Sequence, residues 1–119
     1  MDKVVLAEKF AAFSDTWSPK LVGEVNDMHV KVAKLKGEFV WHQHAEEDEL
    51  FLVIKGHLLL KLRDRDISLH AGEFFIVPRG VEHMPIADEE CHVLLLEPST
   101  TLNTGNITNE RTVSTLGTV

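Results

Sequence analysis

Three of the seven histidines and one glutamate stand at spacings that suit a metal site. His42 and His44 are two residues apart, so on a β-strand both side chains project from the same face. Glu49 begins an apolar run, and His83 follows the turn sequence Pro78–Gly80. Three imidazoles and one carboxylate form an N3O ligand set with open positions, which suits Fe, Mn, Zn or Ni. The sequence therefore predicts a divalent metal ion held by His42, His44, Glu49 and His83.

The acidic run before Glu49 offers one alternative carboxylate. Glu47 has the same strand parity as Glu49 and is the second choice as ligand. The rest of the run, Glu46 and Asp48, is typical of a solvated loop. Arg79, inside the turn before His83, is a minor candidate for contact with a substrate.

Other residues near the predicted site are expected to have structural roles. Four histidines occupy no ligand position and are interpreted as structural or surface residues: His29, His57, His70 and His92. Trp41 and Gln43 have the opposite parity to His42 and should point away from the metal. We expect Trp41 to pack against a helix, the C-terminal arm or a partner chain.

Short apolar runs separated by turn residues must position these ligands. Nine strands without intervening helices predict an antiparallel all-β sandwich or barrel. Gly56 and the Arg63–Asp66 run predict hairpin turns. The expected strands are Leu21–Asn26, Met28–Leu35, Phe39–His44, Glu49–Lys55, His57–Arg63, Asp66–His70, Phe74–Val77, Glu82–Ile86 and Cys91–Glu97.

The two ends of the chain differ from this middle. Apolar residues at helical spacing predict a short helix over Val4–Phe13. Residues 99–119 are rich in Ser, Thr and Asn, which favours a flexible tail, yet they also carry spaced apolar residues. We expect an extended C-terminal arm that docks on its own barrel or on a neighbour's. One domain, residues 1–119 with a barrel over about 20–98, accounts for the chain.

Two predicted strands are apolar on both faces. Leu50–Ile54 and Val93–Leu96 show no alternation, so each should be buried on two sides. One side is the barrel interior, and the other needs a second surface. A homodimer is the resulting hypothesis.

The bulk composition limits the partners. A net charge of −7 disfavours nucleic acid and anionic membranes, because both reward clustered Lys and Arg. The single cysteine, Cys91, excludes an intrachain disulfide and favours a buried thiol in a cytoplasmic protein. No run is long enough for a membrane helix, and the N-terminus is too charged for a signal peptide.

The motif positions together resemble the cupin superfamily. Its first motif is matched by Gly37, four residues, His42-Gln43-His44, four residues, Glu49, six residues and Gly56. Its second is matched by Gly72, five residues, Pro78-Arg79-Gly80, two residues and His83. One residue fewer follows Gly37 than usual, and Ala87 stands where the motif has Asn. Neither departure touches a ligand position.

The resemblance implies a double-stranded β-helix, or jelly-roll barrel, with the four ligands pointing inward. It leaves the activity open, because one fold hosts many functions. We expect a metal-dependent enzyme acting on a small organic molecule, of either isomerase or dioxygenase type. A loose likeness to phosphomannose-isomerase-like cupins rests on Glu97-Pro98 and Thr101–Gly105. The alternative is a non-catalytic binding or sensory module.

Overall fold

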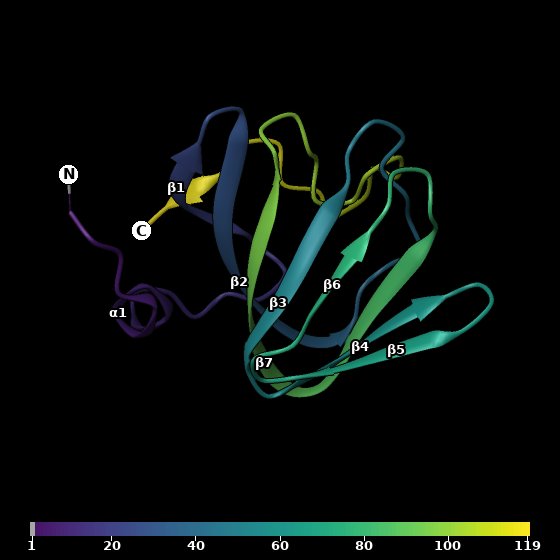
Figure 1. Cartoon of the computed structure of the whole chain (residues 1–119), viewed down its shortest axis with the longest axis horizontal. Helices are drawn as coiled ribbons and strands as arrows, with labels where there is room; N and C mark the ends of the chain where they lie inside the picture. The colour runs from purple at the N-terminus through teal and green to yellow at the C-terminus, as the bar shows by residue number, and fades with distance from the viewer. Residues whose placement is uncertain (1) are drawn as a thin grey trace.

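The computed structural model describes residues 2–119, which form one helix and eight strands (Figure 1). The helix α1 is Leu6–Ala11, shorter at both ends than expected. The strands are β1 (Lys20–Val25), β2 (Met28–Glu38), β3 (Glu49–Lys55), β4 (His57–Leu62), β5 (Asp66–His70), β6 (Phe74–Val77), β7 (His83–Pro98) and β8 (Gly117–Thr118). No helix among the described residues is long and apolar enough to cross a membrane.

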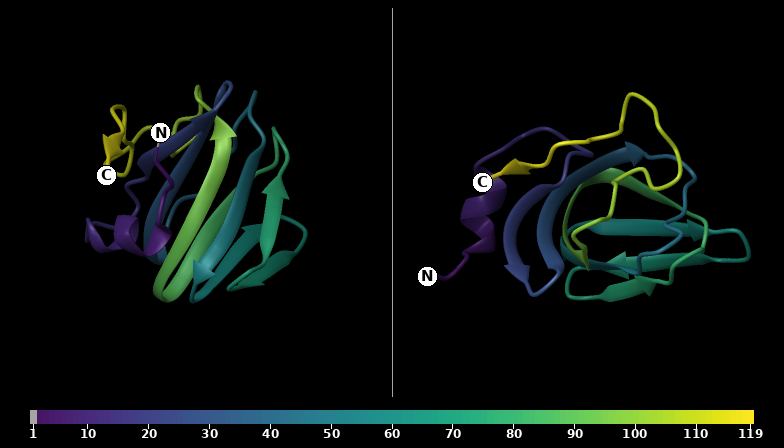
Figure 2. Two further views of the ribbon diagram at one scale, coloured as in Figure 1. Left: turned by 60° about the vertical axis from the view of Figure 1, so that its left-hand side comes forward. Right: turned by 90° about the horizontal axis from the view of Figure 1, so that it is seen from above.

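The long strand β7 organises the sheet. Its first residues pair with β4, its later residues pair with β3, and β2 lies along its other edge. The order β5-β4-β7-β2-β1-β8 is completed by β3, which pairs with both β7 and β6. The sheet curves back on itself, as the two views in Figure 2 show. The expected all-β architecture with a short N-terminal helix is confirmed.

Alternate side chains from the curved sheet build the core. Inward positions such as Ala33, Phe51, Val53, Val93 and Leu95 are buried in one cluster. Burial of this kind stabilises by about 25 cal/mol per Å² of apolar surface. The single cysteine, Cys91, is buried in the same cluster, as expected.

Three of the local predictions were wrong. Glu82–Ile86 and Cys91–Glu97 form one strand, because β2 continues beside the acidic residues between them with a register shift after Leu35. Gly56 is not a hairpin turn, since β3 and β4 both run along β7 and do not pair with each other. At φ +92° it kinks the chain against Glu90 and Cys91, where a Cβ would lie 3.1 Å from the Glu90 carbonyl oxygen.

The third wrong prediction is the strand Phe39–His44. This segment forms no regular strand and has only one isolated bridge, between His42 and His83. Its other edge lies against the C-terminal segment, where the Asn106 N–H donates to the Gln43 carbonyl oxygen. That segment, residues 99–119, docks on its own barrel, where β8 pairs in parallel with β1 (Figure 1).

The outer face of β6, β3, β7 and β2 carries two apolar rows. One row aligns Ile76, Leu50, Leu96 and Val30, and the other aligns Phe74, Leu52, Leu94 and Val32. Within these rows, Phe74 and Ile76 are 59% and 47% exposed. Phe10 of the helix α1, in contrast, is buried and stacks on His92. The two-sided apolar character predicted for β3 and β7 is therefore real, and the oligomeric state stays a prediction.

Candidate metal centre

The four predicted ligands come from three parts of the chain. Glu49 is the first residue of β3 and His83 the first of β7. His42 and His44 lie on the segment that follows β2. Two backbone hydrogen bonds join His42 of this segment to the start of β7, from the His42 N–H to the His83 carbonyl oxygen (3.0 Å) and from the His83 N–H to the His42 carbonyl oxygen (2.9 Å). Neighbouring backbones thus bring distant imidazoles to one place.

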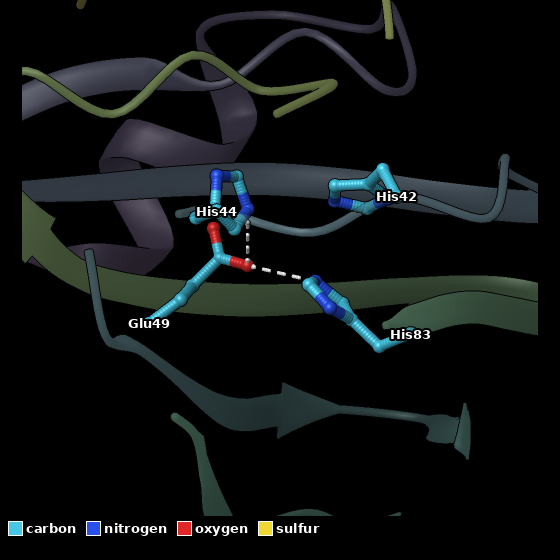
Figure 3. Close-up of side chains that lie close together, drawn as sticks. All are labelled: His42, His44, Glu49 and His83. Carbon is cyan, nitrogen blue, oxygen red and sulfur yellow. Dashed lines mark ion pairs between the residues drawn. The ribbon is translucent and has the colours of Figure 1, made fainter. Parts of the chain in front are cut away.

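The four side chains converge (Figure 3). One donor atom from each residue lies within 4.8 Å of the donor atoms of the other three. Glu49 Oε1 is 3.4 Å from both His44 Nε2 and His83 Nε2. All four residues are buried, with at most 3% of each exposed. The structure therefore brings together the complete predicted ligand set.

The imidazole hydrogen bonds fix which nitrogen faces the centre. His42 Nδ1 lies 2.9 Å from the Val40 carbonyl oxygen, and His83 Nδ1 lies 3.0 Å from the Val81 carbonyl oxygen. A carbonyl oxygen only accepts, so each Nδ1 carries the proton and donates it. Nε2 of both rings then presents a lone pair to the centre, as metal-binding histidines require.

Unpartnered polar atoms show that the site fits a cation. His44 Nε2, His83 Nε2 and Glu49 Oε1 are buried without a hydrogen-bond partner in the described chain. Leaving such atoms unpaired costs about 1–3 kcal/mol each. A divalent metal ion at their meeting point would satisfy all of them at once, and three imidazoles with one carboxylate match its preferred donors. These four residues lie close together and could bind a metal.

The local electrostatics keep the ligands in metal-binding form. Burial and the neighbouring His83 lower the pKa of His42 to about 4, which leaves its imidazole neutral at pH 7. Burial alone would raise the pKa of Glu49, but its close contacts with Glu97, His44 and His83 hold it well below its ordinary value. Glu49 is therefore an ionised carboxylate close to the neutral imidazole of His42.

A buried lysine–glutamate pair behind Glu49 was missed by the sequence reasoning. Lys31 Nζ lies 2.7 Å from Glu97 Oε1, and both residues are 1% exposed. Burial and the negative charge of Glu49 raise the pKa of Glu97 well above its ordinary value. A signal existed in the sequence. Lys31 has the inward parity of Ala33, and Glu97 that of Leu95.

A small apolar cavity of about 40 Å³ lies beside the centre. His42, Glu49 and Glu97 supply polar groups to its wall. The remaining lining is mostly apolar and aromatic: Trp17, Pro19, Ala33, Leu35, Phe39, Phe51, Pro85, Val93, Leu95 and Asn103. The cavity has room for only a few water molecules.

The secondary candidates lie elsewhere. Glu47 accepts a hydrogen bond from the Thr100 hydroxyl (2.8 Å) and is not among the converging residues. Arg79 is exposed and pairs with Asp48 instead of lining the cavity. Trp41 stacks beneath the Arg63 guanidinium, 3.7 Å from its ring centre, which is not one of the expected packing partners.

Residues 28–97, more than half of the chain, match the family model of the cupin domain. The fold is similar to that of a cupin-2 domain containing protein from Shewanella frigidimarina, with a TM-score of 0.79 and 46% sequence identity. That match covers 80% of this chain and 93% of the Shewanella chain.

Two curated proteins are also similar in sequence. YdbB of Bacillus subtilis is 39% identical over 77 residues, or 64% of this chain and 62% of YdbB. The 3-hydroxyanthranilate 3,4-dioxygenase 2 of Aspergillus fumigatus is 32% identical over 80 residues, or 62% of this chain and 42% of the dioxygenase. The chain therefore spans less than two thirds of either relative. The family match contains all four converging residues and the strands that carry them, so this chain belongs to the cupin family.

Proposed function

We propose that this cupin binds one divalent metal ion through His42, His44, Glu49 and His83 and acts as a dioxygenase-like enzyme on a small organic molecule. The observation that carries the proposal is the convergence of four buried ligand atoms, three of them without hydrogen-bond partners, beside an apolar cavity. A bound iron or manganese ion would supply open positions for dioxygen and for an oxygen atom of the substrate.

The cavity wall supports an apolar substrate over a sugar phosphate. Its lining contains no Lys or Arg among the described residues. The buried ammonium group of Lys31 is already used by Glu97. An isomerase acting on a phosphosugar needs a cationic clamp for the phosphate, because an unpaired anion is costly to bury. The similarity to a 3-hydroxyanthranilate 3,4-dioxygenase adds support for oxidative chemistry.

The cavity size favours a second candidate, a non-catalytic module that binds a very small ligand at the metal. Pockets for organic ligands usually measure about 300–1,000 Å³, whereas this one has about 40 Å³. An enzyme of the proposed kind must therefore widen the cavity to admit its substrate. A binding module needs no such opening, and turnover separates the two candidates.

The experiment uses the 119-residue chain loaded with Fe(II) under argon. Nitric oxide, which binds where dioxygen would bind, should give the electron paramagnetic resonance signal of a ferrous nitrosyl. Oxygen uptake is then measured with 3-hydroxyanthranilate, and isomerisation with mannose 6-phosphate. We expect the nitrosyl signal and no isomerisation. Loaded protein that gives no nitrosyl signal would contradict an open coordination position, and conversion of mannose 6-phosphate would overturn the dioxygenase-like assignment.

A further inference from the structure

The segment that carries two of the four ligands is held by the sheet on one side only. His42 bridges to His83, but residues 39–48 belong to no strand. A histidine ligand keeps its place only if its backbone is fixed, because small displacements misalign the lone pair with the metal. What lies on the open side of this segment therefore matters to the metal site.

That side is occupied by Asn106 of the C-terminal segment. The Gln43 N–H donates to Asn106 Oδ1 (2.9 Å), and the Asn106 N–H donates to the Gln43 carbonyl oxygen (3.0 Å). One residue, 63 positions away in the sequence, thus satisfies both backbone groups of Gln43. Gln43 stands between His42 and His44, so these two bonds fix the backbone that joins the two ligands.

Gly105 permits this close approach. It has φ +57°, and a Cβ added to it would overlap the Gln43 carbonyl oxygen and lie 3.2 Å from His42 Cδ2. Any other residue would push the C-terminal segment away from the ligands or displace the ligands themselves. The glycine is therefore required by contact with the metal site as well as by its backbone conformation.

The rest of the C-terminal segment anchors this contact. Thr104 is fully buried, and its hydroxyl bonds to the Ile107 carbonyl oxygen and the Thr112 hydroxyl. The Arg111 guanidinium lies over the rings of Trp17 and Phe39, 5.6 and 5.9 Å from their centres. Figure 2 shows this segment running along the barrel before it returns to β1. Asn106 thus projects from a structured segment.

We infer that Asn106 is a positioning residue for the metal ligands His42 and His44, and that Gly105 allows it to reach them. The inference rests on the proposed metal binding. Both residues lie outside the range matched by the cupin family model, residues 28–97. The cupin domain of this chain therefore completes its metal site with a segment that the family match does not include.

The test is a competition titration of the full chain with Co(II) against a chromophoric chelator. Asn106→Ala removes one hydrogen bond from an exposed pair and should weaken Co(II) binding about threefold to tenfold. Gly105→Ala forces a backbone displacement and should weaken it about tenfold to a hundredfold. Asn106→Asp keeps the acceptor oxygen and should bind Co(II) within about threefold of wild type.

Two matched controls separate positioning from general destabilisation. Asn109 caps a turn in the same segment, through its Oδ1 and the Arg111 N–H (2.8 Å), and contacts no ligand. Gly72 has φ +86° with nothing within 4 Å of an added Cβ, so Gly72→Ala carries the backbone strain alone. Asn109→Ala and Gly72→Ala should bind Co(II) like wild type, with an unchanged ligand-field spectrum. Urea unfolding of each metal-free variant measures its loss of stability independently.

The inference is overturned if Asn106→Ala and Gly105→Ala bind Co(II) as tightly as wild type with the same spectrum. It is equally overturned if the two controls lose affinity to the same extent, because the effect would then follow stability. If the wild type itself binds no Co(II), the proposed function fails first and the inference fails with it.

Discussion

The lysine–glutamate pair inside the barrel gives the most demanding prediction about stability. Lys31 Nζ lies 2.7 Å from Glu97 Oε1, with both residues 1% exposed. No other partner of the Lys31 ammonium group is found in the described chain. Replacing Glu97 by an apolar residue of similar size therefore leaves a buried cation unpaired.

The expected cost is large compared with the stability of a small domain. Breaking a buried pair by removing one partner costs about 3–5 kcal/mol, and domains of this size have about 5–15 kcal/mol in total. Glu97→Leu should lose that amount. The double variant Lys31→Met/Glu97→Leu removes the buried ammonium group together with its partner and should recover most of it. Glu97→Gln should cost only about 1 kcal/mol, because the amide keeps an acceptor oxygen for the Lys31 ammonium group and the raised pKa of Glu97 favours the neutral form that an amide resembles.

Urea unfolding of the metal-free protein at pH 7 measures these differences. With a slope of about 1.5 kcal/mol per M, Glu97→Leu should lower the midpoint by about 2–3 M. The reasoning is refuted if Glu97→Leu costs less than about 1 kcal/mol, or if the double variant is as unstable as Glu97→Leu. A Glu97→Gln variant as unstable as Glu97→Leu would show instead that Glu97 is ionised.

Three further predictions concern single groups and one surface. The pKa of His42 falls from 6.5 to about 4 on folding, so between these pH values only the unfolded chain takes up this proton. The free energy of unfolding of the metal-free protein should therefore fall by about 3 kcal/mol as the pH falls through that window. Urea unfolding at a series of pH values measures this loss, which should be smaller in His42→Gln. Burial raises the pKa of Cys91 to about 11, so Ellman's reagent should label it only on unfolding, and rapid labelling of native protein would contradict its burial. We propose a homodimer through the outer face of β3, β6 and β7, burying at least about 1,000 Å²; light scattering should give a dimer for wild type and a monomer for Leu52→Glu, and a monomeric wild type at micromolar concentration would rule the dimer out.

The candidate site could be predicted because its signals are local. The two-residue spacing of His42 and His44 fixes a common side in any extended chain, even though the predicted strand is only a bridge. Glu49 opens a strand whose bounds were predicted correctly, and His83 follows a turn marked by Pro78 and Gly80. Such features can be recognised even where the secondary structure predicted around them is wrong.

The features that were missed depend on contacts between distant residues. Nothing in the Ser- and Thr-rich C-terminal segment indicates that Asn106 bonds to Gln43, because one side-chain hydrogen bond leaves no periodic pattern. The acidic residues after Ala87 indicate a turn by composition, yet pairing with β2 keeps them within β7. The alternation of each strand places Lys31 and Glu97 on the inward face, but it does not show that the two side chains meet. Their pairing can be predicted only when β2 and β7 are known to be neighbours.

The central claim is that His42, His44, Glu49 and His83 hold one metal ion, and metal analysis tests it most directly. The protein is purified without a metal-chelating column, incubated with Fe(II) under argon, desalted and measured by mass spectrometry. Wild type and His57→Ala, which alters an exposed histidine bonded to Ser68, should retain about one ion per chain. His42→Ala and His83→Ala should lose nearly all of it while remaining folded. Equal metal content in wild type and in these two variants would contradict the account.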